Sequence, residues 1–499
     1  MRELVADLRK RVSDTPDAEI VVDKDGVHTL AGILSAGEAL AAQLESVAGS
    51  GSTLLLQADN TWRTVVGVVA AGCTGGTLAL ISRHSTRQEF AAACEDIAPD
   101  AVVAAPELFD AWGADGFRPP SDTDVLDGWR LAGERGLPSG RWRDGAVIGL
   151  TSGSTGRAKG VVQSERALRY ACRSTIEAVG LRPGDAIGAM VPLSSAAAIC
   201  FGAYLPLLLG GRMVVLDKWD PAEAVRMLAE HEARWTMCVP TMALQMGAAA
   251  TGEGLLASMV AMTVGGGPMD AGALSRAERR LGTSFLRVFG MSECLGHTTS
   301  SPDDPEEIRL GTDGTPFPGT VLRAVDETGN VLPPGETGRA QVNGPSLFTG
   351  YARGGAVTAP ELTGDGFLPT GDLIEVRPDG RVSVRGREKD IIIRGGRNID
   401  IAEVEGAVAR HQQVDQVCVV AVPDEVLGER VAALVVSSSG NLDLPAIQDH
   451  LGREGLMKGK WPEYVFQVEA LPQNRVGKLS RRDATDLAVR LREATAGSG

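Results

Sequence analysis

Apolar runs of strand length alternate with longer helix-like stretches through the first 300 residues, and this alternation limits the fold more than any other feature. The strand-like runs lie at 53–57, 101–104, 146–150, 186–191 and 212–216, with helical patterns such as 221–231 between them. Such alternation predicts layered α/β structure with largely parallel sheets. Because 499 residues are too many for one hydrophobic core, more than one such unit is expected.

The texture of the chain changes twice after this first part. From about residue 310 glycine and proline become frequent, and short β runs at 321–325 and 339–342 are joined by turn sequences. From about residue 390 a helical pattern with Ile401, Val404 and Val408 on one face precedes two strand patterns and another helix, at 417–422, 431–436 and 444–454. We therefore expect an α/β fold with a large N-terminal domain, 1–386, made of two α/β layered subdomains and a β-rich subdomain at about 310–386. A small α+β domain, 387–499, follows it.

Charge and composition exclude several classes of protein. The net charge of −15 argues against a nucleic-acid binder or a binder of anionic membranes, since both need a basic surface. The longest apolar segment, 196–211, contains proline and glycine and falls short of the ~18 apolar residues of a membrane span, so we expect a buried helix and turn. Seven scattered cysteines without a CxxC pair, and an N-terminus without a signal-peptide core, are typical of a cytoplasmic protein with reduced thiols.

Residues 149–162, GLTSGSTGRAKGVV, are rich in glycine and hydroxyl side chains. A strand-like run enters this segment, and a helical pattern starting at Ser164 follows it. Glycines allow close backbone approach, and backbone N–H groups, hydroxyls and Lys159 all donate to phosphate oxygens. The position between two regular elements favours a phosphate loop over a flexible linker. It is not a Walker A loop, because Ala158 precedes Lys159 and Gly160 follows it.

A loop of this kind that ends in Lys-Gly resembles the phosphate loop of the adenylate-forming enzymes, which include acyl-CoA and aryl-CoA synthetases, carrier-loading adenylation domains and luciferases. Further segments resemble motifs of that family in the same order: VGGGP at 264–268, FGMSE at 289–293, PTGDL at 369–373, GREKDIIIRGGRNI at 386–399 and NRVGKLSR at 474–481. The resemblance covers essentially the whole chain.

The resemblance implies a set of residues that contact ATP or AMP. This set comprises Thr151, Ser152, Gly153, Ser154, Thr155, Gly156, Gly265, Gly266, Gly267, Pro268, Phe289, Gly290, Met291, Asp372 and Arg387. In the family Phe289 would face the adenine, and Asp372 and Arg387 would bind the ribose. Catalytic roles are implied for Lys159, Ser292, Glu293 and Lys478, with Ser292 on a phosphate and Glu293 holding magnesium.

The chemistry explains why such residues are needed. Attack of a carboxylate on the α-phosphate of ATP joins two anions, so the enzyme must supply positioning and positive charge. By the resemblance, Lys478 reaches both reacting groups, and magnesium at Glu293 adds charge. Each residue alone has a plainer interpretation: Lys478 as a solvated charge, Asp372 as a turn residue, and Ser292 with Glu293 as a helix start.

A second step is also implied by the family. Its C-terminal domain is mobile and swings about a hinge, here Lys389, which withdraws the lysine and opens a tunnel for the thiol of CoA. Gly395 and Gly396 would line that tunnel, although a simple turn is an alternative interpretation. The acceptor is CoA or a carrier protein. With no carrier domain after residue 499, we expect a stand-alone ligase.

Two departures from the family pattern concern the substrate and the first step. PLSSAAA, 192–198, replaces a Pro-Leu-aromatic-His segment, which predicts a roomy acid pocket around Ser194, Ser195, Met291 and His297 for a bulky acid; alternatively Met291 or His297 fills the space. Glu165 stands where the family commonly has His, and it either faces phosphate or points to solvent. Together they motivate a hypothesis of a ligase that chiefly converts a supplied acyl-adenylate to a thioester.

The sequence thus predicts an AMP-forming acyl- or aryl-CoA ligase that uses ATP, Mg²⁺ and CoA on a small carboxylic acid. Loading of a carrier protein is the main alternative. A non-enzymatic nucleotide-binding protein is disfavoured, because it has no need to keep Glu293, Asp372 and Lys478 together. The oligomeric state is left open between monomer and homodimer.

Overall fold

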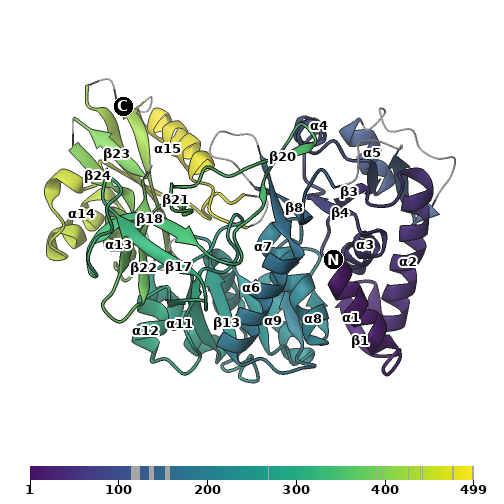
Figure 1. The fold of residues 1–499 in the computed structure, drawn as a ribbon. Helices are drawn as coiled ribbons and strands as arrows, with labels where there is room; N and C mark the ends of the chain where they lie inside the picture. The colour runs from purple at the N-terminus through teal and green to yellow at the C-terminus, as the bar shows by residue number, and fades with distance from the viewer. Residues whose placement is uncertain are drawn as a thin grey trace.

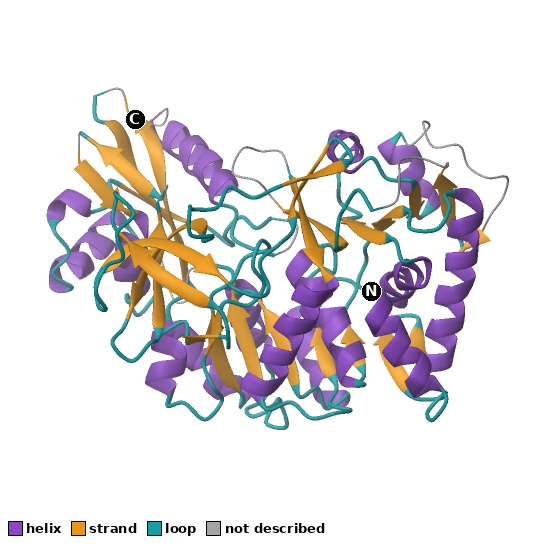
Figure 2. Cartoon of the chain, viewed as in Figure 1, coloured by secondary structure: helices purple, strands orange, loops and turns teal. Residues whose placement is uncertain are grey.

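The structure is a computed structural model that describes residues 1–113, 124–133, 140–151, 158–267, 269–388, 390–395, 397–424, 426–438, 440, 442–474 and 477–496. Within these residues, strands form layers covered by helices (Figure 2). The C-terminal sheet with α13, α14 and α15 lies at the left of Figure 1, and the N-terminal helices α1, α2 and α3 lie at the right. The expected α/β fold class is confirmed.

One layer is a nine-stranded mixed sheet whose central strands are parallel. Alternate residues of its strand β3 face opposite sides: Leu54 and Leu56 pack in the core that contains α3, whereas Leu55 packs in the core that contains α4. The strands, in spatial order, are β20 Ala356–Thr358, β19 Gly350–Arg353, β9 Lys159–Ser164, β8 Gly145–Thr151, β4 Thr77–Ile81, β3 Thr53–Gln57, β5 Ala101–Ala104, β7 Trp129–Gly133 and β6 Asp124–Val125.

The second layer is a seven-stranded sheet that is parallel except for its edge strand β2. Its strands, in spatial order, are β14 Ser284–Val288, β13 Ala261–Gly265, β12 Trp235–Cys238, β10 Ile187–Ala189, β11 Met213–Val215, β1 Glu19–Asp23 and β2 Gly26–Thr29. The helices of the two layers are α1 Arg2–Val12, α2 Leu30–Val47, α3 Trp62–Thr74, α4 Arg87–Ile97, α5 Pro106–Trp112, α6 Glu165–Val179, α7 Ala196–Ala198, α8 Leu205–Leu209, α9 Pro221–Glu230, α10 Pro240–Ala249, α11 Ala271–Leu281 and α12 Glu306–Gly311.

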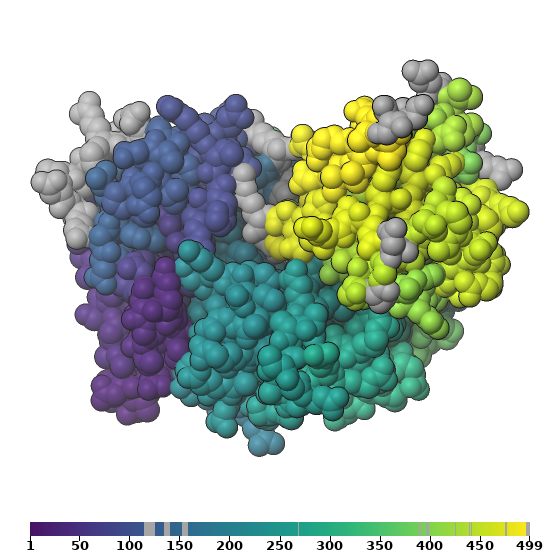
Figure 3. Space-filling view, turned by 180° about the vertical axis from the view of Figure 1, so that it is seen from behind, coloured from purple at the N-terminus to yellow at the C-terminus, as the bar shows by residue number. Residues whose placement is uncertain are grey.

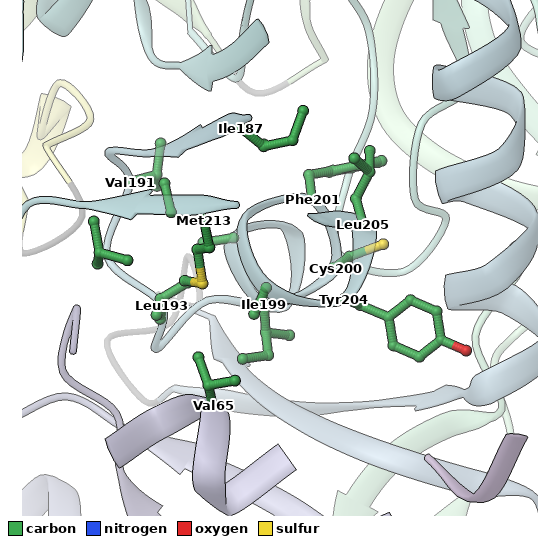
Figure 4. Packing of buried hydrophobic residues seen from close by; sticks show 14 of the residues in the cluster. Val65, Ile187, Val191, Leu193, Ile199, Cys200, Phe201, Tyr204, Leu205 and Met213 are labelled. Carbon is green, nitrogen blue, oxygen red and sulfur yellow. The ribbon is translucent and has the colours of Figure 1, made fainter. Parts of the chain in front are cut away.

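The apolar segment 196–211 is a buried helix and turn, as expected. Between α7 and α8 it contains a π-helix, Ile199–Tyr204, and Gly210 ends α8 in the left-handed conformation. Figure 4 shows Ile199 on the side of this segment that faces Val65 of α3, and Phe201 and Leu205 on the opposite side. The segment joins the two layers, because α7 contacts β8 of the nine-stranded sheet and the π-helix contacts β10 of the seven-stranded sheet. Among the described residues, no helix is long and apolar enough to cross a bilayer.

The rest of the chain is richer in strands. An antiparallel four-stranded sheet consists of β17 Val321–Val325, β18 Thr337–Asn343, β21 Leu368–Val376 and β22 Val382–Arg387, and β15 Thr298–Thr299 pairs with β16 Thr315–Pro316. The C-terminal sheet consists of β24 Arg397–Asp400, β23 Ile391–Arg394, β26 Gly428–Val436, β25 Gln416–Asp424 and β27 Tyr464–Gln467, with helices α13 Ile401–Ala409, α14 Leu444–Arg453 and α15 Arg481–Ala496 and a 3₁₀ turn, Lys458–Lys460.

The C-terminal residues are docked on the N-terminal layers. Seen from behind, the C-terminal segment (yellow) lies directly against the part of the chain drawn in teal (Figure 3). The Thr241 hydroxyl, in the first turn of α10, donates to the Gly477 carbonyl at 2.7 Å. This contact fixes where the following residue, Lys478, enters the large domain.

Candidate active site

Lys478 lies on a short hairpin that reaches from the C-terminal sheet into the large domain. Gln473 and Leu479 bridge across the hairpin, and the backbone N–H of Lys478 donates to Asn474 Oδ1 at 3.0 Å. Burial lowers the pKa of Lys478, Arg387 lowers it further, and the Glu293 carboxylate opposes both. A partly buried cation is stabilised by any anionic group that binds beside it.

The glycine turn after β13 receives the lysine. A Cβ at Gly266 would lie 2.7 Å from Lys478 Nζ, and Gly266 has a φ of +84° that other residues rarely adopt. Gly265 packs so closely on β14 that a Cβ would lie 2.3 Å from Val288 Cγ1, whereas Gly267 has only ordinary contact with Pro240 at 3.7 Å. The turn therefore requires glycine at two of these three positions.

Asp372 and Arg387 are cross-strand partners on β21 and β22. Arg387 Nε donates to Asp372 Oδ1 at 3.0 Å, and the arginine side chain is 69% exposed while that of Asp372 is only 9% exposed. Burial raises the pKa of Asp372, and the Arg387 guanidinium opposes this. The two residues expected at the ribose are thus brought together, with the carboxylate buried and the guanidinium exposed.

Glu293 is held by Tyr351, a residue that the motif comparison did not single out. The Tyr351 hydroxyl donates to Glu293 Oε1 at 2.9 Å, and Lys159 Nζ lies 5.1 Å from the centre of the Tyr351 ring. The three residues come from β9, β19 and the loop after β14, which are distant in sequence. The only sequence signal for Tyr351 is the GYA segment at 350–352.

The Glu293 carboxylate fits the donor set of magnesium in nucleotide sites. No group of three or more His, Cys, Asp or Glu suited to a metal occurs among the described residues. Mg²⁺ is typically bound by one or two carboxylates plus substrate phosphates and water, so a single placed carboxylate is sufficient. Glu293 would hold such an ion together with the nucleotide.

Phe289 and Ser292, from the FGMSE segment, are held by contacts with His297 and Gln163. The Phe289 ring packs edge-to-face on His297 with 4.7 Å between ring centres, and Gln163 Nε2 donates to the Ser292 carbonyl at 2.7 Å. Burial lowers the pKa of His297 to about 3, so its ring is neutral, and neither ring nitrogen has a partner of normal hydrogen-bond geometry in the described chain. His297 supports the aromatic motif and is fully buried.

The expected roomy acid pocket around PLSSAAA is not supported by the packing. Ser194 is buried, and the Ser195 hydroxyl caps α7 by accepting from the Ala198 N–H at 3.1 Å. Strand β8 fills the space: a Cβ at Gly149 would lie 2.7 Å from Ala196 Cβ. A cavity beside this segment, lined by Ala198 and Phe201 among others, measures only about 10 Å³. Small side chains here allow close packing of backbone segments.

Both expected orientations of Glu165 are wrong. Its side chain is 14% exposed and accepts hydrogen bonds from the Leu4 N–H at 2.8 Å, the Tyr204 hydroxyl at 3.0 Å and the amino nitrogen of Met1 at 2.7 Å. Ser164 is the N-cap of α6, as expected, and this places Glu165 in the first turn, where α1 covers it. Glu165 therefore anchors α1 and faces neither phosphate nor solvent.

The expected strand before the loop and the helix that follows Ser164 are confirmed, and the structure adds a strand between the loop and that helix. A strand, β9, lies between the loop and α6, so the loop connects two antiparallel strands and does not lead directly into a helix. The KGVVQS sequence continues the sheet because its residues after Lys159 are buried on both faces. Of the expected phosphate contacts, Thr151 ends β8 and Lys159 begins β9.

Several expected site residues lie outside the described residues. They are Ser152, Gly153, Ser154, Thr155, Gly156, Pro268, Lys389 and Gly396. Gly395 is described: it lies in the exposed turn between β23 and β24 with a φ of +54°, and its N–H donates to the Leu427 carbonyl at 2.8 Å. In this arrangement the contacts of Gly395 are with its own C-terminal sheet, while Lys478 occupies the large domain.

The sequence matches two families. Residues 8–352 match the family described as AMP-binding enzyme, and residues 403–478 match the AMP-binding enzyme C-terminal domain. A 2,3-dihydroxybenzoate–AMP ligase of Bacillus subtilis is 32% identical over 69% of this chain, and a medium-chain fatty-acid–CoA ligase of Escherichia coli is 30% identical over 67%. The chain covers less than two thirds of the length of these curated relatives, 65% and 60%.

A solved structure extends the likeness over nearly the whole chain. ATP-bound MatB of Rhodopseudomonas palustris has a TM-score of 0.83 at 26% identity, covering 98% of this chain and 99% of its own. Apo MatB, with the same coverage, has a lower TM-score of 0.75. The arrangement with Lys478 docked is therefore closer to the ATP-bound form of that protein. With two family matches, the ordered motifs and this shared architecture, the chain belongs to the AMP-binding, adenylate-forming enzyme family.

Proposed function

We propose that this protein activates a carboxylic acid with ATP, as an acyl-adenylate, and transfers the acyl group to the thiol of CoA. The observation that carries the proposal is the position of Lys478. Its Nζ lies against Gly266, and the charges of Glu293 and Arg387 both shift its pKa. A partly buried lysine beside a glycine turn and an acidic residue has no evident structural purpose. It suits a step that joins two anions.

In the first step, a carboxylate oxygen of the acid attacks the α-phosphorus of ATP, and the bond to the β-phosphate oxygen breaks to release pyrophosphate. Lys478 would donate to both the carboxylate and the α-phosphate, reducing their repulsion. Lys159 would neutralise the departing phosphates, and Asp372 with Arg387 would hold the ribose by accepting and donating hydrogen bonds. Mg²⁺ held by Glu293 would supply further positive charge to the phosphates.

In the second step, the thiol of CoA attacks the acyl carbonyl, and AMP leaves. We propose that Lys478 withdraws first by rotation of the C-terminal domain at Lys389, and that this rotation brings Gly395 and Gly396 to the reaction centre. The Thr241 to Gly477 hydrogen bond would break in that rotation. A carrier-protein thiol is the second candidate acceptor, favoured by the likeness to a 2,3-dihydroxybenzoate–AMP ligase.

Two sequence features, Glu165 and PLSSAAA, suggested an enzyme restricted to thioester formation, and the structure removes the first of them as support. Glu165 is bonded to α1 and so has no bearing on the triphosphate. We therefore propose that both half-reactions are catalysed. The free thiols of all seven cysteines suit the reducing cytoplasm, where ATP and CoA are found.

The test is acid-dependent exchange of pyrophosphate into ATP, measured with purified protein, Mg²⁺ and acids ordered by size, from acetate to aryl and polycyclic acids. At least one acid is expected to support exchange, and adding CoA is expected to convert that acid to its thioester with equal release of AMP. Exchange without CoA consumption would identify another acceptor. Tight AMP binding without exchange for any acid would refute the enzymatic proposal.

A further inference from the structure

A polar cavity of about 370 Å³, separate from the small one beside PLSSAAA, opens at the carboxyl ends of β3 and β5. β3 ends at Gln57 and β5 at Ala104, and the lining includes Gln57, Asp59 and Ala105. In this sheet β3 lies between β4 and β5. The chain passes from β3 through α3 to β4 on one side, and then from β4 through α4 to β5 on the other side of β3. Open α/β sheets bind ligands at such a switch in strand order, and the volume is that of small-ligand sites.

The basic side chains of this cavity already have acidic partners. Lys24 Nζ donates to Asp217 Oδ2 at 2.8 Å, and Arg83 donates to Asp217 Oδ1 at 2.7 Å. Arg63 donates to Asp25 Oδ2 at 2.6 Å. These pairs leave no strong demand for an anionic ligand.

Two hydrogen-bond acceptors of the cavity residues lack a donor among the described residues. The side chain of Asp59 is 10% exposed: its Oδ2 accepts from Gln57 Nε2 at 2.7 Å, but its Oδ1 is buried without a hydrogen-bond partner in the described chain. Thr61 is 2% exposed, and its hydroxyl likewise lacks a partner among the residues that the structure describes. Leaving buried acceptors unsatisfied costs about 1–3 kcal/mol each, more for a charged group.

Charge selects the kind of donor. The nearest charged pair of Asp59 is with Arg83 at 3.6 Å, and Arg83 is committed to Asp217. Glu107 and His84 also line the cavity. Together with Asp217, which pairs with Lys24 and Arg83 from outside the lining, the acids Asp25, Asp59 and Glu107 outnumber the three Lys and Arg side chains. A neutral or anionic ligand would leave this excess negative charge, whereas a compact cation with several N–H donors removes it.

We propose that this cavity binds a small primary amine in its ammonium form, with the nitrogen at Asp59 and Thr61. The alkyl part of the ligand lies along Leu108 and the Trp129 ring, which line the same cavity. This inference is independent of the proposed function, since none of these residues belongs to the Lys478 site.

The experiment titrates butylamine, which is cationic at neutral pH, into the full chain and follows binding by saturation-transfer NMR, with 1-butanol as the neutral analogue. Saturable binding of butylamine is expected, with much weaker binding of butanol. Asp59→Asn should weaken butylamine binding about tenfold or more, and Thr61→Val about threefold, because each removes one charge or acceptor at the nitrogen. Asp379→Asn, in an exposed turn paired with Arg381, is the matched control and should bind as the wild type does.

Two readouts separate a binding role from a structural one. Asn can still accept from Gln57, so Asp59→Asn should have a Tm equal to or above that of the wild type, and its pyrophosphate exchange should be unchanged. A lower Tm would show that Asp59 has a structural partner and would overturn the proposal. So would unsaturable binding, equal binding of butanol, or an unchanged Kd for butylamine in Asp59→Asn.

Discussion

The Lys478 site and the Asp59 cavity are both polar regions of the large domain, but they are assembled differently. The Lys478 site draws on the glycine turn, the loop after β14, two sheets and a hairpin of the C-terminal domain. The Asp59 cavity is built from the ends of neighbouring strands and the β1–β2 turn, without the C-terminal domain. The first should therefore depend on the docked arrangement of the chain, and the second should not.

The largest expected effect that separates the two regions is at the glycine turn. Gly266→Ala places a Cβ 2.7 Å from Lys478 Nζ and at an unfavourable φ. Displacing Lys478 by about 1 Å should lower the adenylation rate about 100-fold, measured by pyrophosphate exchange, while butylamine binding is unchanged.

Gly252→Ala is the matched control, since Gly252 lies outside the expected nucleotide-contacting set and a Cβ there meets only Leu255 at 3.7 Å. Its exchange rate should stay within about twofold of the wild type. Wild-type exchange in Gly266→Ala would show that Lys478 does not need its position beside the turn.

The next effect is on nucleotide affinity. Asp372→Asn removes the carboxylate that is paired with Arg387 and expected at the ribose. Loss of charge-assisted hydrogen bonds worth about 1.5–3 kcal/mol predicts a Kd for ATP about 10–100-fold higher, measured by calorimetry. Asp379→Asn should leave ATP binding unchanged. Equal ATP affinity in both variants would remove Asp372 from the nucleotide site.

A smaller effect is expected at the newly identified tyrosine. Tyr351→Phe removes the 2.9 Å hydrogen bond to Glu293 and should lower exchange activity about 3–10-fold. The Mg²⁺ concentration for half-maximal activity should rise, because the Glu293 carboxylate is less fixed. Tyr170→Phe loses a comparable bond, to the Pro318 carbonyl, away from this site and should change neither value. An unchanged Mg²⁺ requirement in Tyr351→Phe would refute the positioning role.

The smallest effect on catalysis is expected at Glu165, which belongs to neither region. Glu165→Ala removes hydrogen bonds to the first turn of α1 and to Tyr204, so stability should fall by about 2 kcal/mol and Tm by about 2 °C. The KM for ATP should not change. A raised KM for ATP at unchanged Tm would return Glu165 to the triphosphate.

Local sequence patterns were sufficient for many elements but not for pairings between distant segments. The runs at 53–57, 101–104 and 321–325 coincide with β3, β5 and β17. Each of these strands shows in the local sequence, because its apolar residues are the ones that it buries. β19 and β20 fall within the segment expected to form the β-rich subdomain, yet they extend the nine-stranded sheet through pairing of β19 with β9. Such pairing depends on residues nearly 200 positions apart.

The same distinction applies to the sites. Motif order led to Lys478, Glu293, Asp372 and Arg387, and the structure brings these residues together. It did not lead to Tyr351 or Asp59, and it singled out Glu165 without its partners on α1, because the partners of these residues come from other segments of the chain. Ser195, which we expected at the acid pocket, shows a local contact instead: its hydroxyl caps the helix that begins beside it.

The most direct test of the account compares the two half-reactions in Lys478→Ala. Acid-dependent pyrophosphate exchange should fall at least about 100-fold, because the partly buried cation at the reacting anions is lost. Thioester formation from preformed acyl-adenylate and CoA should stay within about threefold of the wild type. Lys460→Ala, which removes another C-terminal lysine paired with Glu403, should retain both. Equal loss of both half-reactions in Lys478→Ala, or retention of exchange, would contradict the assignment of Lys478 to adenylation.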